Sequence, residues 1–478
     1  MPSRFKAIDL EHKQYLTPAR LGIIFLIFLS LVSGWMITQY NPVVIIGVVG
    51  VIVYMAILFF WPYIGVLLYL VFEYARLPAM FPALQVLQIG KLIIVPTLLM
   101  LFIRVLIVKD RKLVFDNVYL ILLAWLMLAV VGAPFAINSA AWPAIFALLK
   151  WFITCFLVIN LVTNLPKFQY FIWLLLLLNL KLSQHQIRSF YHGYQHVSDT
   201  YRDFFIHQGV GAGSSSFLAN ATDFGLAMVV VAPLALYLIP SVRSKILKFF
   251  AGGTLAAFIT SILKSGSRGA AVAMFAMAGL FWFKSKNKLI LIVVMVLFVM
   301  IFWSMAPDAW QERFISIGDY EEDATAMQRI DLWKAGIRIF LDHPIFGVGV
   351  DQYGRAFESG YRPADYRGAT AAHSIFIQAA AELGAGGLFI LLLLLFVLFK
   401  RNWETRRLYR KAGLNENWLW NFSLALDLSL LGFIVGGAFL TVLYYPHLYM
   451  ILAMIISLHH ITKRKANEAA GGINISHV

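Results

Sequence analysis

The stretch SIFIQAAAELGAGGLFILLLLLFVLF, residues 374–399, decides the fold class of this chain. It contains one ionisable residue, Glu382, and exceeds the roughly 20 apolar residues that a helix needs to cross a bilayer. The whole chain has the same character, since 61% of its 478 residues are hydrophobic and 13% are charged. A soluble domain carries roughly 25% charged residues, so the composition predicts an integral membrane protein.

Similar apolar runs recur along the whole chain. Inside a bilayer the backbone N–H and C=O groups of such a run must find hydrogen-bond partners within the protein, and an α-helix supplies them. We therefore predict an all-α, polytopic membrane helix bundle of about 12–14 transmembrane helices, because two of the fourteen candidate runs form one stretch broken at Pro62. We expect one integral membrane domain (1–478), with a flexible cytoplasmic tail at 466–478. The candidate spans lie near 21–40, 43–61, 62–75, 85–107, 116–135, 142–163, 168–182, 217–240, 247–263, 268–283, 287–306, 374–399, 418–443 and 446–462.

The basic residues predict the topology. If the spans alternate, more than half of the 39 Lys and Arg residues fall on one side of the membrane. The positive-inside rule makes that side cytoplasmic, together with both termini. The formal charge of +15 therefore indicates loops at a membrane rather than nucleic-acid binding. The only cysteine, Cys155, lies in an apolar run, which excludes disulfides and cysteine-based metal sites.

The largest segment left on the outer side is 307–372, which contains six arginines and a single lysine. Within it, RIDLWKAGIRIFLDHP (329–344) predicts an amphipathic helix that ends at or just before Asp342 and His343, because Pro344 disfavours helix in the residue before it. The helix would lie on the outer surface or fold over the membrane core. Its arginines are suited to binding a pyrophosphate. The alternative is a helix that only covers the membrane core and binds no ligand. Its predicted apolar face is Ile330, Trp333, Ile337, Phe340 and Leu341, opposite Lys334, Arg338 and Asp342.

Further candidates come after this helix. The glycine-punctuated stretch GVGVDQYGRAF (347–357) is followed by His373, at the start of a membrane helix. A neutral imidazole there can take a proton from a hydroxyl near pH 7, although a histidine at a helix start is also a common structural cap. Ser374, Gln378 and Glu382 form one polar stripe. Glu382 should point away from His373, so we do not expect it to orient the imidazole.

Two other groups of charged residues are candidates. In KSGSRG (264–269), Lys264 and Arg268 flank small residues at an outer link between two spans. Such a link suits phosphate, although the cations can also be snorkelling caps. Inside the predicted spans, ionisable groups are expensive and need a partner or a cavity. The residues concerned are Lys91, Lys150, Asp223 and Asp427. We expect either a buried Lys–Asp pair or contacts to lipid phosphate.

Over roughly 200–390, these segments resemble the bacterial O-antigen ligase and O-antigen polymerase superfamily of membrane glycosyltransferases. The stretch Gly213 to Ala227 resembles the family's Gly…Phe…Asn-Pro-Asn segment, with Ala221-Thr222 in place of the proline and second asparagine. The other residues that carry the resemblance are Ser267-Arg268-Gly269-Ala270, Arg329, Trp333, His343-Pro344-Ile345-Phe346-Gly347-Val348-Gly349, Tyr353, His373-Ser374, Glu382-Leu383-Gly384 and Gly387.

The resemblance implies transfer of a glycan from undecaprenyl diphosphate to an acceptor hydroxyl at the periplasmic face of the bacterial inner membrane, without a metal or other cofactor. It implies that Arg268 and Arg329 hold the pyrophosphate and that His373 helps to deprotonate the acceptor. The expected partners are the lipid-linked donor, a lipid A–core or growing-glycan acceptor and membrane lipids, with no nucleic acid. The expected substrate-binding residues are Arg338, Lys91, Lys264, Tyr353 and Asn220.

The sequence leaves several functions open. A ligase acting on lipid A–core is favoured over a polymerase that extends the glycan and over an oligosaccharyltransferase acting on protein hydroxyls. A lipid-linked glycan flippase would instead show charges distributed through the spans and modest outer loops. The polar residues here are concentrated in 307–372, which favours surface chemistry.

Overall fold

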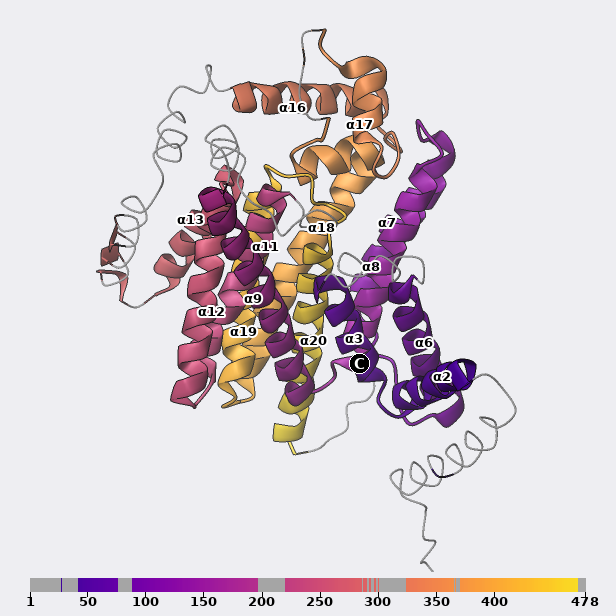
Figure 1. Ribbon diagram of the computed structural model, residues 1–478, viewed down its shortest axis with the longest axis vertical. Helices are drawn as coiled ribbons and strands as arrows, with labels where there is room; N and C mark the ends of the chain where they lie inside the picture. The colour runs from indigo at the N-terminus through magenta and orange to yellow at the C-terminus, as the bar shows by residue number, and fades with distance from the viewer. Residues whose placement is uncertain are drawn as a thin grey trace, which may run out of the picture. The chain divides into compact units, whose positions relative to one another are not determined.

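The computed structural model describes residues 27, 42–75, 88–196, 220–285, 287–289, 292–293, 296–297, 300, 324–364, 366 and 370–471 (Figure 1). Within these residues every regular element is helical, which confirms the predicted all-α class. The helices are α2 (Pro42–Phe60), α3 (Pro62–Ala75), α6 (Ile89–Ile103), η1 (Arg104–Val108), α7 (Val118–Gly132), η2 (Ala133–Phe135), α8 (Ala141–Leu161), α9 (Leu165–His196), α11 (Ala221–Ser241), α12 (Lys245–Lys264), α13 (Arg268–Lys284), α16 (Ala324–Asp342), α17 (Tyr353–Ala356), η3 (Phe357–Tyr361), α18 (Ile375–Lys411), α19 (Asn417–Gly437) and α20 (Pro446–Ala469).

The chain divides into two compact units, Met1–Ile64 and Gly65–Val478. The described part of the first unit is residue 27 and residues 42–64, which contain α2 and the start of α3. All the predicted site residues belong to the second unit. Its last helix, α20, runs to Ala469 and so continues into the predicted tail at 466–478.

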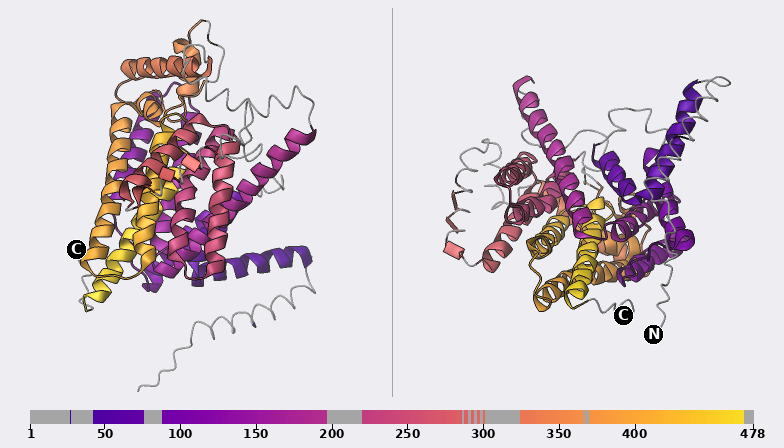
Figure 2. Two further views of the ribbon diagram at one scale, coloured as in Figure 1. Left: turned by 90° about the vertical axis from the view of Figure 1, so that its left-hand side faces the viewer. Right: turned by 90° about the horizontal axis from the view of Figure 1, so that it is seen from below.

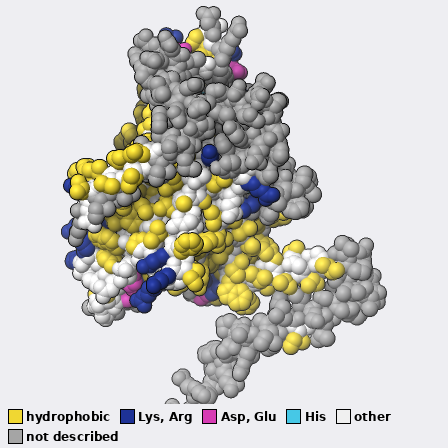
Figure 3. All heavy atoms as spheres, turned by 60° about the vertical axis from the view of Figure 1, so that its left-hand side comes forward, with side chains coloured by type: hydrophobic (Ala, Val, Ile, Leu, Met, Phe, Trp, Pro, Cys, Tyr) yellow, Lys and Arg dark blue, Asp and Glu magenta, His cyan; other side chains and the backbone are white. Residues whose placement is uncertain are grey.

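Eight helices in the described part of the chain are long and apolar enough to cross a membrane, which confirms a multi-pass protein. Hydrophobic side chains cover much of the visible surface of the bundle (Figure 3). The predicted spans at 21–40 and 287–306 lie largely outside the described residues, so the total of 12–14 stays a prediction. The eight are Ile89–Val108, Val118–Phe135, Ala141–Leu161, Leu165–Ser189, Ala221–Ser241, Lys245–Lys264, Ile375–Lys411 and Asn417–Gly437.

Polar contacts gather several basic segments at one end of the bundle. The Asp116 carboxylate, just before α7, contacts Arg401 of α18 at 3.3 Å and His460 of α20 at 3.0 Å. The ammonium group of Lys465 lies 2.5 Å from the carboxylate of Glu416. These contacts agree with the prediction that the basic segments share one side of the membrane.

The charged side chains within the bundle have partners that differ from the predicted Lys–Asp pair. Lys150 of α8 lies 3.6 Å from the Glu73 carboxylate of α3. Asp427 of α19 instead pairs with Arg406 of α18, at 2.8 Å. Of the two alternatives left open, the Lys–Asp pair is wrong for Lys150 and Asp427. A contact between distant helices leaves no spacing signal in the sequence.

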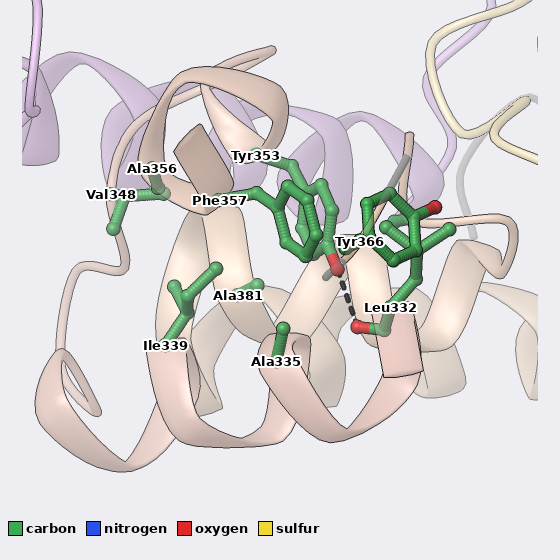
Figure 4. Close-up of a cluster of buried hydrophobic side chains, with 10 residues drawn as sticks. Leu332, Ala335, Ile339, Val348, Tyr353, Ala356, Phe357, Tyr366 and Ala381 are labelled. Carbon is green, nitrogen blue, oxygen red and sulfur yellow. Dashed lines mark hydrogen bonds between the residues drawn. The ribbon is translucent and has the colours of Figure 1, made fainter. Parts of the chain in front are cut away.

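The helix α16 lies across one end of the bundle, crosswise to the long helix α18 (Figures 1 and 2). It ends at Asp342, as Pro344 predicts. Its buried face is Leu332, Ala335 and Ile339, which pack with residues of α17, η3 and α18 (Figure 4).

The apolar face predicted for this helix was therefore wrong in part. Ile337 and Leu341 are 49% and 65% exposed. The small residues Ala335 and Gly336 face the protein instead, because they allow close approach. A Cβ atom added to Gly336 would lie 2.2 Å from the side chain of Ile377.

Candidate functional site

The backbone of His373 is held in an unusual conformation. Its φ is 45°, in the left-handed region, which costs an L-residue roughly 1–2 kcal/mol although histidine tolerates it better than most. The N–H of His373 donates to the Thr441 hydroxyl at 2.8 Å, and its carbonyl accepts from the Trp333 indole at 3.3 Å. Two separate elements therefore fix the direction in which the imidazole projects.

The imidazole of His373 is neutral at physiological pH. Burial, and secondarily the nearby positive charge of Arg329, lower the pKa of His373 from 6.5 to about 4. Among the described residues, its Nδ1 atom is buried and has no hydrogen-bond partner. A buried polar atom usually finds a partner, so this nitrogen suits a hydroxyl supplied by a bound substrate.

The start of α13 belongs to the same end of the bundle. Ser267 caps α13 by accepting a hydrogen bond from the Ala270 N–H at 3.2 Å, and Arg268 is the first residue of the helix. A Cβ atom on Gly269 would lie 3.3 Å from Phe439, whose ring centroid is 6.2 Å from that of Trp333. These contacts bring the helix that carries Arg268 to the neighbourhood of His373.

A segment whose role the sequence did not indicate connects these parts. Residues 438–445, which we call the 438–445 strap, were assigned largely to a span at 418–443, but α19 ends at Gly437. Besides Thr441, the strap uses the hydroxyl of Tyr444, which donates to Glu382 at 2.7 Å, and that of Tyr445, which donates to Asp223 at 3.0 Å. The available signal was a cluster of hydroxyl-bearing residues, TVLYY, directly before Pro446.

Glu382 holds the turn after α16 rather than the imidazole, as expected. Its buried carboxylate accepts hydrogen bonds from the backbone N–H groups of Asp351 at 3.0 Å and Tyr353 at 3.1 Å. It also accepts from Gln378 at 3.4 Å and from Tyr444. One carboxylate therefore ties α18, the 438–445 strap and the start of α17 together.

The same turn packs backbone against backbone on a break in α18. Gly384, inside the first third of the helix, has a φ of 67°, and the N–H of Ala385 donates to the Pro344 carbonyl at 2.8 Å. The Gly349 N–H donates to the Glu382 carbonyl at 3.0 Å. A Cβ atom on Gly384 would lie 2.4 Å from the Ile345 carbonyl oxygen, so only glycine fits this contact. The two motifs resembling the O-antigen family, at 343–349 and 382–384, are thus two sides of one interface.

The predicted substrate-binding residues differ in burial and in their contacts. Tyr353 is buried, and its hydroxyl donates to the Leu332 carbonyl inside the cluster of Figure 4. Asn220 caps α11 by accepting from the Thr222 N–H at 3.0 Å. Lys264 is half-buried at the end of α12. Arg338 is exposed on α16, and Lys91 is exposed on α6. Their roles in binding stay predictions.

The described residues contain no group of three or more His, Cys, Asp or Glu side chains that could hold a metal ion. Residues 252–392, from within α12 to within α18, match the protein-family model for O-antigen ligase. No curated protein matches the chain. The family match covers Arg268, Arg329, His373 and both sides of the glycine interface, which confirms the resemblance for that part of the chain.

Proposed function

From the O-antigen ligase domain at residues 252–392, we propose that this membrane glycosyltransferase moves a glycan from undecaprenyl diphosphate to a hydroxyl of lipid A–core. The family match supports glycosyl transfer in general, and the donor and acceptor are our proposal. The reaction takes place at the periplasmic face of the inner membrane, at the end of the bundle that carries α16, and both termini are cytoplasmic.

The observation that carries this proposal is the buried, unpartnered Nδ1 of His373, for which the described residues supply no hydrogen-bond donor. A base must be unprotonated before it can act, and the lowered pKa of His373, about 4, keeps it so at neutral pH. The acceptor hydroxyl donates to this nitrogen, and its oxygen attacks the anomeric carbon of the glycan. The proton passes to the imidazole as the bond between that carbon and the diphosphate oxygen breaks.

The arginines act on the leaving group. Arg329 is close enough to His373 to lower the pKa of the imidazole, so a diphosphate bound at Arg329 also lies near the base. The bound anion offsets the guanidinium charge, and the pKa of His373 rises when the donor is present. Arg268, on the neighbouring helix α13, adds positive charge as negative charge develops on the departing diphosphate.

The proposal is tested in a strain that lacks this protein. We expect loss of long glycan from lipid A–core on a polysaccharide gel, accumulation of lipid-linked polymer, and restoration by the wild type. His373→Asn should restore nothing while inserting normally, because asparagine tolerates the left-handed backbone but is not a base. The matched control is His343→Asn, which replaces an exposed histidine directly after α16 and should restore the glycan.

The possible results separate the candidate functions. A deletion strain that keeps single repeat units on lipid A–core would show a polymerase instead. The purified protein in detergent, given a lipid-linked donor and lipid A–core, should form the covalent product, which a flippase does not. Full activity of His373→Asn would refute the role of the imidazole.

A further inference from the structure

The side of α16 opposite its packed residues Leu332 and Ile339 is both apolar and cationic. Ile337 and Leu341, four residues apart, are 49% and 65% exposed. Lys334 and Arg338, also four residues apart, are exposed beside them on the side of the helix opposite Leu332 and Ile339. We call these four residues the outward face of α16. Such a face suits the boundary between lipid tails and headgroups better than bulk water.

This face continues into a surface that meets lipid. Four exposed apolar residues form a stripe along α7, which is part of the candidate membrane span Val118–Phe135: Leu120, Leu123, Met127 and Val131. The stripe leads to Phe135, whose ring stacks on Phe346 with centroids 5.0 Å apart. Ile345, the neighbour of Phe346, is 68% exposed just beyond the end of α16. Exposed apolar side chains therefore follow one another from the spanning helix α7 to α16.

We propose that the outward face of α16 is embedded in the membrane leaflet in which α7 ends. Ile337, Leu341 and Ile345 lie among the upper acyl chains, and Lys334 and Arg338 contact the phosphates of anionic phospholipids. The apolar side chains alone would fit many partners, but their continuity with α7 and the adjacent pair of cations favour a lipid surface. Long cationic side chains commonly reach from an apolar surface to the headgroups in this way.

The depth of α16 has a structural consequence at the candidate site. Trp333 of the same helix donates a hydrogen bond to the His373 carbonyl. A helix seated at headgroup depth therefore holds His373 at that depth too. This inference stands without the proposed function, because it rests on the exposed surface and not on the reaction.

Spin labelling tests the inference directly. The only cysteine, Cys155, is buried, and Cys155→Ser gives a chain without other labelling sites while preserving a donor to the Tyr449 carbonyl. Nitroxide labels are then placed singly through Leu341→Cys and Ile345→Cys, in nanodiscs of phosphatidylcholine and phosphatidylglycerol. Collisions with oxygen, which partitions into lipid, are compared with collisions with a water-soluble nickel chelate. Leu123→Cys on α7 is the lipid reference, and Glu358→Cys on η3 is the water reference, since both side chains are exposed.

We expect the labels at 341 and 345 to resemble the one at 123, with high oxygen and low nickel accessibility. Values like those at 358 would overturn the inference, as would dipolar broadening that shows a second copy of the chain against this face. The ratio of oxygen to nickel accessibility at 341 should be higher with phosphatidylglycerol than with phosphatidylcholine alone. Lys334→Gln combined with Arg338→Gln should remove that difference. A ratio insensitive to lipid charge would overturn the contact between these cations and lipid phosphates.

Discussion

Replacing Gly384 by alanine should weaken the protein through two separable effects. The first is the backbone, because a φ of 67° costs alanine roughly 1–2 kcal/mol. The second is the new Cβ atom, which would lie 2.4 Å from the Ile345 carbonyl oxygen and 2.6 Å from that of Pro344. These neighbours are backbone atoms, so the turn after α16 must shift, and overpacking of this kind costs about 1–3 kcal/mol. The total expected loss is about 2–5 kcal/mol.

Gly413 offers a matched control for the backbone effect. Its φ is 60°, and a Cβ atom there would meet nothing within 4 Å. Gly413→Ala should therefore cost only the backbone penalty of about 1–2 kcal/mol. The difference between the two variants isolates the contact between the break in α18 and the turn after α16.

Free energies of unfolding can be compared in mixed micelles by titration with sodium dodecyl sulfate, followed by tryptophan fluorescence. Gly384→Ala should lose about 1–3 kcal/mol more than Gly413→Ala, which is the overpacking cost alone. Equal losses in the two variants would refute the close approach at Gly384.

Three other predictions concern side chains of the site and the bundle. As pH falls from 6.5 to 4, His373 becomes protonated in the unfolded chain but stays neutral in the folded protein, where its pKa is about 4. Wild-type stability should therefore fall over this window, and melting temperatures against pH should show a smaller fall for His373→Asn. Thr441→Val should lower the transfer rate about fivefold through the loss of roughly 1 kcal/mol of hydrogen bonding to His373, with rescue by Thr441→Ser in an assay of the purified protein. Asp427→Ala should lower the free energy of unfolding by about 3–5 kcal/mol, because Arg406, whose side chain is only 12% exposed, is left without its carboxylate; a loss no larger than that of an exposed charge would contradict this.

The sequence predicted the fold class because long apolar runs and basic segments follow directly from the bilayer as solvent. It also predicted the end of α16, since the effect of Pro344 is local. The inward face of α16 was predicted wrongly for a physical reason. Near a membrane, apolar side chains such as Ile337 and Leu341 can face lipid as well as protein, so periodicity alone does not identify the packed side.

The candidate site was predicted only in part. Short motifs and a family resemblance identified His373, Arg329 and Arg268, because each motif can be recognised within one continuous segment of sequence. The 438–445 strap was missed because TVL at 441–443 continues the apolar run of the preceding helix. Its role depends on contacts with His373 and Glu382 that are far away in the sequence, and such contacts leave no local pattern.

Because of the 438–445 strap, the candidate site extends beyond the part of the chain that matches the family model. The family match stops at residue 392, yet Thr441 and Tyr444, which contact His373 and Glu382, lie about fifty residues further on. A fragment limited to 252–392 would contain the motifs but lack the 438–445 strap, whose hydrogen bonds hold His373 and Glu382. Transplanting this chemistry to another scaffold therefore requires the chain through Tyr445, beyond the end of the family match.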